Sequence, residues 1–164
     1  MVPSFYLASR SPRRQELLAG LGYAFSVCAA DIDETPGIGE DPRAFARRMA
    51  TSKAQVGARQ IGAEALVLAA DTDVAIDGEI LGKPRDEAHA VEMLMRLSGA
   101  THWVHSAVAV ALGERLEVVE TATRIHFASL TPAQARAYWA TGEPRDKAGA
   151  YALQGRAARW VRAI

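Results

Sequence analysis

The chain of 164 residues contains a single cysteine, Cys28, so no disulfide can form within it and a reducing compartment is favoured. No apolar run is long enough to span a bilayer. The N-terminus lacks a signal-peptide pattern, because a charged residue stands at Arg10 with no apolar run before it. We therefore expect a cytoplasmic protein with no membrane partner.

An excess of either charge is also missing, because Lys and Arg together number 19 and Asp and Glu together number 19. A balanced charge gives no support for a general role in nucleic-acid binding, although it is compatible with a local basic site. Gly-x-Gly-x-x-Gly is absent, and Gly82-Lys83-Pro84 lacks the residue spacing of a P-loop. We expect one domain over residues 1–164 and no nucleic-acid partner.

The first predicted helix carries positive charge at the end where helix physics disfavours it. Ser11 is suited to be the helix N-cap and Pro12 the first helical residue. Arg13 and Arg14 then lie beside free backbone N–H groups and the positive end of the helix dipole. Cations are disfavoured there unless an anion is held in front of them. The segment therefore predicts either a phosphate-binding site or two arginines that point into solvent.

Strands and helices alternate irregularly along the rest of the chain. One long antiparallel pair in the middle favours an α/β (α+β) fold, a mixed sheet flanked by helices, over a strict doubly wound fold. The expected helices are about 42–60, 85–97 and 132–140; the expected strands are 6–8, 65–70, 103–112, 116–127 and a last one from 159, with a type I′ hairpin between 74–76 and 79–81.

Asp71 directly follows the apolar run 67–70, so we expect a carboxylate at the end of a buried strand. A carboxylate in that place can hold a metal or act as a general base with a pKa tuned by burial. The alternative is an Asx turn, since Asp71-Thr72-Asp73 also fits a strand-to-hairpin corner. We favour a functional role, because the strand is so apolar and two further oxygen-bearing side chains follow at once.

Two lysines are candidate anion contacts. Lys53 shares the phase of the apolar face of helix 42–60, so it either reaches an anion or extends past the core edge to water. Lys83 precedes Pro84, which locks the local chain; it is either a rigidly presented phosphate contact or part of an ordinary surface turn.

Other candidates lie in loops. Glu34 belongs to the acidic run Asp31–Glu34, for which a solvated loop is the alternative, and Gln154 lies in a small-residue loop that lets backbone approach a ligand. His102 and His105 face opposite sides of a predicted strand and are not a metal pair. Several cations and at least two carboxylates between elements are what the cleavage of a phosphoanhydride requires.

These residues follow one another in the order of the motifs of the Maf family of nucleoside triphosphate pyrophosphatases, which the chain resembles over nearly its whole length. The resemblance implies a curved mixed sheet with helices, similar to inosine triphosphatase, in two lobes around a central cleft, and often a homodimer. The matching stretches are Ser9–Arg14, Asp31–Glu34, Lys53-Ala54, Ala70–Thr72, Gly82–Pro84, Ser98-Gly99 with Val104, and Asp146–Tyr151 through Gln154-Gly155.

The resemblance implies hydrolysis of a nucleoside triphosphate to the monophosphate and pyrophosphate with a divalent metal, Mg²⁺ or Mn²⁺. It implies Asp71 as the general base and both Asp71 and Glu34 as metal ligands. The catalytic set then comprises Asp71, Glu34, Lys53 and Lys83, and the substrate-binding set comprises Ser9, Arg13, Arg14, Thr72 and Gln154.

Arg13, Thr72 and Gln154 match the branch of the family that prefers dTTP and UTP, so these nucleotides, and modified pyrimidine nucleotides with them, are the expected substrates. The alternatives are a pyrophosphatase that prefers methylated GTP and a non-catalytic nucleotide-binding regulator of cell division. Two departures stand out. Asp73 adds an acid where many members have an apolar or small residue, and the sequence stops at Ile164, where family members usually continue with another strand and helix.

Overall fold

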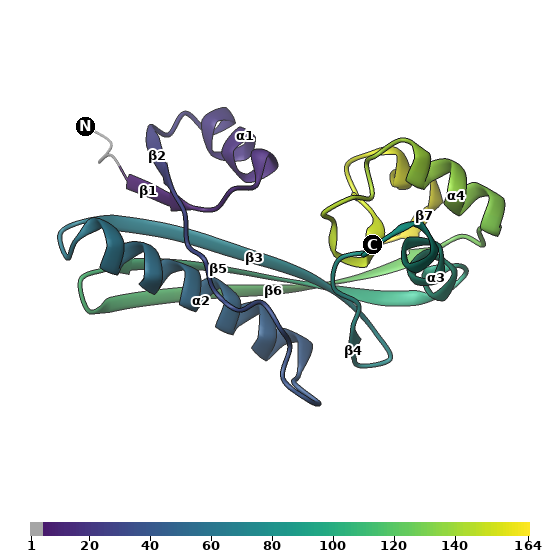
Figure 1. The fold of residues 1–164 in the computed structure, drawn as a ribbon, viewed down its shortest axis with the longest axis horizontal. Coiled ribbons are helices and arrows are strands. Elements are labelled where there is room, and N and C mark those ends of the chain that lie inside the picture. Colours follow the sequence, from purple (N-terminus) through teal and green to yellow (C-terminus); the bar gives the residue numbers. More distant parts are fainter. Residues whose placement is uncertain (1–4) are drawn as a thin grey trace. The chain divides into compact units, whose positions relative to one another are not determined.

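The computed structural model describes residues 5–164 and divides into two compact units (Figure 1). Unit 1 consists of the chain up to Asp71 together with Ser106–Thr121, and unit 2 consists of Thr72–His105 and Ala122–Ile164. Each unit therefore contains two separate stretches of chain.

Strands and helices alternate as the sequence predicts. Among the described residues, seven strands form a mixed sheet in the order β2-β1-β3-β5-β6-β7, with β4 paired to β3. Strand β1 runs parallel to β2 and β3, whereas β4 is antiparallel to β3 and β7 to β6. The elements are β1 (Phe5–Ala8), α1 (Pro12–Gly20), β2 (Phe25–Cys28), α2 (Pro42–Ile61), β3 (Leu66–Ile76), β4 (Glu79–Ile80), α3 (Glu87–Leu97), β5 (Thr101–Leu112), β6 (Arg115–Phe127), α4 (Pro132–Ala140), the 3₁₀ helices η1 (Ala148–Ala150) and η2 (Arg156–Trp160), and β7 (Val161–Ala163).

Local sequence signals account for several element boundaries. The Asp41 carboxylate accepts a hydrogen bond from the Ala44 amide and caps α2, whose first residue is a proline. Thr131 and Gln134 form the predicted capping box of α4. Asp77 and Gly78 have φ of 52° and 79°, as the predicted type I′ turn between β3 and β4 requires.

Strand β3 corrects the prediction for Asp71. We expected a strand that ends before this residue, but β3 continues for 11 residues from Leu66 to Ile76. Asp71 therefore lies inside a strand, and the Asx-turn alternative is also wrong. The side chains change from apolar to polar at Asp71 because their surroundings change there. The backbone nevertheless stays extended as far as Ile76, so the strand does not end where the apolar run ends.

Smaller corrections concern the ends of elements. Ser11 is the N-cap residue of α1, but its side chain makes no capping hydrogen bond to the described residues. Helix α3 begins at Glu87, because Asp86 is its N-cap and accepts from the His89 amide. The last strand begins at Val161, after the 3₁₀ turn of η2. Strand β2 was not predicted.

Unit 1 has a core cluster made almost entirely of alanine, into which α2 packs closely. A Cβ placed on Gly57 of α2 would lie 2.9 Å from Cγ1 of Val67 and 3.2 Å from Cβ of Ala8. Small side chains thus let the helix approach the sheet, along which it runs in Figure 1. The members of the cluster are Ala8, Cys28, Ala46, Ala50, Ala54, Ala58, Val67, Ala69, Ala107, Ala109 and Ala111.

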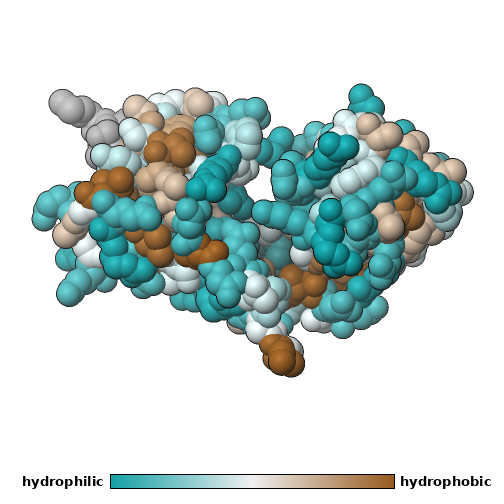
Figure 2. Space-filling model, viewed as in Figure 1, coloured by the Kyte–Doolittle hydropathy of each residue, from teal (hydrophilic) through white to brown (hydrophobic). Residues whose placement is uncertain are grey.

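Unit 2 has a core of large side chains. Tyr138, Phe127 and Leu94 are fully buried there, and the rings of Tyr138 and Trp160 meet edge to face with centroids 5.1 Å apart. The face drawn in Figure 2 is mostly hydrophilic, with separate small hydrophobic patches. No helix among the described residues has the length and apolar character needed to cross a membrane.

Candidate functional site

The centre of the candidate site is the ammonium group of Lys53. Its Nζ lies 2.6 Å from Oε1 of Glu34 and 2.7 Å from Oδ1 of Asp71. Only 10% of the Lys53 side chain is exposed, against 13% for Asp71 and 45% for Glu34. Lys53 therefore does not extend to water, as one alternative had it. The acidic loop is exposed as the solvated-loop alternative expects, but Glu34 also contacts the buried ammonium.

The fold explains why Lys53 meets Asp71. Side chains of a strand alternate between its two faces, so Asp71 lies on the same face of β3 as the buried Val67 and Ala69. Gly57 lies one helical turn after Lys53 on α2 and lets the helix approach that face. The apolar packing of α2 on β3 thus brings the ammonium to the carboxylate.

Ser9 and Arg14 lie on the neighbouring segment. Strand β1 pairs with β3 through Tyr6 and Val67, and Ser9 follows the end of β1. The Ser9 hydroxyl oxygen accepts hydrogen bonds from the Ser11 amide at 3.2 Å and from Nη1 of Arg14 at 3.3 Å. Ser9, rather than the predicted Ser11, therefore supplies the polar side chain at the start of α1.

Arg14 experiences the charges of the two carboxylates. Burial lowers the pKa of Arg14, and the negative charges of Asp71 and Glu34 oppose that shift. The group thus contains two basic side chains, Arg14 and Lys53, and two acidic ones, Asp71 and Glu34. Arg13 is exposed, and Arg10 forms an exposed ion pair with Asp31 at 3.0 Å.

The donor chemistry of Glu34 and Asp71 suits a hard divalent cation. Their carboxylate oxygens converge on one point, where the Lys53 ammonium now provides the positive charge. Within the described part of the chain, no group of three or more His, Cys, Asp or Glu side chains could hold a metal. Two carboxylates still fit Mg²⁺, which proteins commonly bind through one or two carboxylates plus substrate phosphates.

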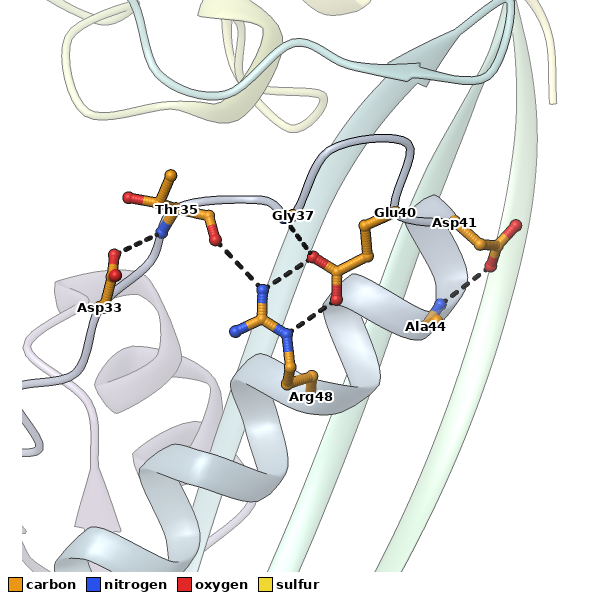
Figure 3. Close-up of polar contacts among 7 residues, drawn as sticks. All are labelled: Asp33, Thr35, Gly37, Glu40, Asp41, Ala44 and Arg48. Carbon is orange, nitrogen blue, oxygen red and sulfur yellow. Dashed lines mark hydrogen bonds and ion pairs between the residues drawn. The ribbon is translucent and has the colours of Figure 1, made fainter.

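The loop that carries Glu34 is held by a set of polar contacts that the sequence did not reveal (Figure 3). Arg48 of α2 donates to both carboxylate oxygens of Glu40, each at 2.7 Å, and to the carbonyl of Thr35 at 3.1 Å. Glu40 also accepts from the Gly37 amide at 2.8 Å. The sequence contained a weak signal for these contacts. Arg48 lies two helical turns after the Asp41 cap and is therefore on the same face of α2 as the residue that follows the loop.

The remaining candidate residues belong to unit 2. Thr72 is exposed on β3, and Lys83 is exposed after Gly82, whose carbonyl accepts from the Gly149 amide at 2.8 Å. Gln154 is exposed in the turn between η1 and η2. Asp73 is 2% exposed. The structure thus brings together Ser9, Arg14, Glu34, Lys53 and Asp71 in unit 1.

The turn around Gln154 is fixed on both sides. The Ala152 amide donates to the Tyr138 hydroxyl at 3.1 Å, and the Arg156 amide donates to the Glu143 carboxylate at 3.0 Å. Gly155 packs so closely on Glu143 that a Cβ there would lie 2.0 Å from Oε1. The backbone of this turn is therefore held in one position, although its residues are small.

The sequence matches a protein family and several named relatives. The profile of the family described as Maf-like protein matches residues 4–164. The dTTP/UTP pyrophosphatase of Myxococcus xanthus is 54% identical over 151 residues, which cover 92% of this chain and 76% of the relative. The protein of the same name from Methylococcus capsulatus is 47% identical over 155 residues, covering 94% and 77%.

Two solved structures share the fold. The nucleoside-triphosphatase / dITP/XTP pyrophosphatase from Mycobacterium abscessus superposes with a TM-score of 0.54 at 21% identity, covering 77% of this chain and 75% of that one. The Ham1 protein of Staphylococcus aureus gives a TM-score of 0.56 at 13% identity, covering 77% and 72%. At such identities the likeness concerns the fold alone, and it confirms the predicted mixed sheet.

Proposed function

Because the chain belongs to the Maf family, we propose that it hydrolyses dTTP and UTP to the nucleoside monophosphate and pyrophosphate. Relatives that cover most of the chain at 47% and 54% identity carry the name dTTP/UTP pyrophosphatase. The structural observation that carries the proposal is the buried Lys53 ammonium between Glu34 and Asp71, with Arg14 beside them. Cations for a polyphosphate and carboxylates for a metal and a water occur there together.

Each side chain has a role in this proposal. Arg14 and Lys53 bind phosphate oxygens, and the Ser9 hydroxyl, which accepts from Nη1 of Arg14, holds the guanidinium in place. Asp71 accepts the proton of the attacking water, because its carboxylate is fixed on a strand and only slightly exposed. Asp71 and Glu34 hold a divalent cation, Mg²⁺ or Mn²⁺, which when bound neutralises phosphate charge.

The roles of the other candidates rest on the family motifs. Lys83 and Arg13 supply further positive charge for the triphosphate. Arg13, Thr72 and Gln154 select the pyrimidine nucleotides. The fixed backbone on both sides of Gln154 supports this role, since a selective contact needs a fixed position.

The test is pyrophosphate release from a panel of triphosphates, including dTTP, UTP, GTP and a methylated GTP, by wild type and Asp71→Asn. The amide keeps the size of the side chain but cannot act as a base, so we expect kcat with dTTP to fall by about 100-fold or more. Chelation of divalent ions should abolish turnover, and added Mg²⁺ or Mn²⁺ should restore it.

The control is Asp77→Asn, which changes an exposed carboxylate in the β3–β4 turn to a residue that also accepts a positive φ. This variant should keep the wild-type kcat. Wild-type turnover by Asp71→Asn would overturn the assignment of the base. Tight triphosphate binding with no product under any divalent ion would favour the non-catalytic regulator, and faster cleavage of methylated GTP would favour the other branch.

A further inference from the structure

We propose that Arg48 is a positioning residue for Glu34: its clamp on Glu40 and on the Thr35 carbonyl fixes the loop so that the Glu34 carboxylate stays at Lys53. The activity part of this inference rests on the proposed function. The structural part, a loop fixed by one guanidinium, stands on contacts alone.

The loop beyond Glu34 depends on such a clamp, because the other contacts of the loop, the packing of Ala30 on the core cluster and the ion pair of Asp31 with Arg10, lie before Glu34. Residues 29–41 form no helix or strand, and Ile38, the large apolar side chain near the tip, is fully exposed. Gly39 has a φ of 68°, in the region that glycine reaches without strain. Ordering such a segment costs backbone entropy at every residue, which the contacts of the loop must offset.

The ion pair of Glu34 with Lys53 is too weak to order the loop by itself. The Glu34 side chain is 45% exposed, and ion pairs with an exposed partner contribute little to stability. Arg48 is exposed to a similar degree, at 43%, but it makes a bidentate contact with Glu40, the geometry in which an exposed pair does contribute. The guanidinium and the Gly37 amide lower the pKa of Glu40 to about 2, so Glu40 is fully ionised at neutral pH.

The clamp acts on the backbone next to Glu34. The Thr35 carbonyl accepts from Nη2 of Arg48 at 3.1 Å, and the Thr35 amide donates to the Asp33 carboxylate at 2.9 Å (Figure 3). Both residues that flank Glu34 are therefore restrained. Arg48 and Lys53 lie on one helix, so α2 fixes both the loop and the ammonium that its carboxylate contacts.

The experiment compares Arg48→Ala and Arg48→Lys with Arg47→Ala. Arg47 is the matched control, because it is the exposed neighbour on α2 and contacts Glu120 instead of the loop. With dTTP, Arg48→Ala should lower kcat and raise the half-saturating Mg²⁺ concentration by about 10-fold or more, as is typical when a residue behind a metal ligand is removed. Arg48→Lys keeps the charge but loses the bidentate geometry, so it should not restore either value.

Hydrogen exchange on the protein without metal or nucleotide provides the second readout. The Thr35 and Gly37 amides should exchange at least several-fold faster in Arg48→Ala than in wild type, while amides of β3 stay unchanged. Glu40→Gln should have the same effect on the loop, and adding it to Arg48→Ala should change little, because the two groups act as one unit.

Wild-type kcat, Mg²⁺ dependence and loop exchange in Arg48→Ala would overturn the inference. An inactive wild type would instead overturn the proposed function, and loop exchange would then decide on Arg48 by itself. If Arg48→Ala unfolds, the loop exchange and the kinetics are measured on Arg48→Lys and Glu40→Gln instead. Wild-type values in both of these variants would reject the clamp.

Discussion

Lys53 shows at the scale of one residue how a buried charge is tolerated. Desolvation of an isolated ammonium is costly, but Lys53 has two carboxylates within 2.7 Å. The residue is 8% exposed, and its charge is neutralised by Asp71 and Glu34. The same geometry that makes the lysine acceptable in the fold places it where a phosphate oxygen would need it.

His102 is a buried residue whose titration should affect stability. It is fully buried in unit 2, where Nε2 lies 2.8 Å from the Tyr151 hydroxyl and Nδ1 has no partner among the described residues. Burial, with a smaller effect from the charge of His126, lowers the pKa of His102 from 6.5 to about 4. The folded protein therefore keeps His102 neutral over a range in which the unfolded chain protonates it.

We predict that this difference destabilises the fold in mild acid. As the pH falls from 6.5 to about 4, the unfolded state binds a proton that the folded state does not, so the free energy of unfolding decreases; below about 4 both states are protonated and the effect is complete. The full loss is about 3 kcal/mol. Urea unfolding of wild type and His102→Gln between pH 7 and pH 4 measures it.

The His102→Gln variant should show a shallower pH dependence than wild type. His89→Gln is the control, because His89 is only partly buried and its removal leaves the buried ring in place. If the free energy of unfolding depended on pH in the same way in wild type and His102→Gln, groups other than His102 would cause the acid sensitivity.

Helix α2 is the element on which the candidate site depends, and Gly57 is where its packing is tightest. An alanine there would gain helix propensity of up to about 1 kcal/mol but would place a Cβ 2.9 Å from the fully buried Val67. Since overpacking costs about 1–3 kcal/mol, we expect Gly57→Ala to lose up to about 2 kcal/mol of stability. Because α2 must shift, kcat should fall as well.

The matched variant is Gly20→Ala in the last turn of α1, where a new Cβ would meet nothing within 4 Å. This variant should gain a few tenths to about 1 kcal/mol of stability, because alanine has a higher helix propensity than glycine and its Cβ would meet no neighbour. Thermal unfolding of both variants measures these opposite signs. A stabilised Gly57→Ala with normal kcat would contradict the close approach of α2 to the sheet.

Elements that depend on local signals were predictable, and contacts between distant segments were not. Proline and capping residues fixed the starts of α2 and α4, and Asp77-Gly78 fixed the hairpin. The continuation of β3 through Asp71 depends on its neighbours in the sheet, which a polar side chain does not reveal. The bond between Arg48 and Glu40 joins a helix to a loop whose path no periodicity describes.

The candidate site was predictable from the sequence to a limited extent. Lone residues such as Lys53 and Glu34 were ambiguous, because burial and partners decide between solvation and function. The motif order of the family resolved that ambiguity in favour of a site, and the structure then showed the contacts. The catalytic and binding roles of all the candidate residues, the metal and the homodimer remain predictions.

At the scale of the whole molecule, the two units differ in what holds them together. Nine of the eleven residues in the core cluster of unit 1 are alanine, whereas the cluster of unit 2 contains rings and long aliphatic chains; unit 1 buries Phe5, Leu7, Phe45 and Met49 outside its cluster. Alanine buries little apolar area per residue, so its contribution to the hydrophobic free energy is small. We infer that the alanine-rich cluster, on which α2 packs, is the weaker of the two clusters.

Native-state hydrogen exchange at low denaturant tests this inference. Amides of α2 in unit 1 should open with a lower free energy than those of α3 in unit 2, because partial unfolding begins in the weaker core. Equal opening free energies in both helices would show instead that the chain unfolds as one cooperative unit.

The division of each unit into two stretches of chain has a consequence for its synthesis. A ribosome completes the segment up to Asp71 first, but the Ala107, Ala109 and Ala111 side chains that finish its core lie on β5. Helix α3 of the other unit is made before them. The nascent N-terminal part must therefore wait with an unfinished core while some 40 more residues are translated, a delay of seconds at about 5–20 residues per second, during which a holding chaperone would have an apolar surface to bind.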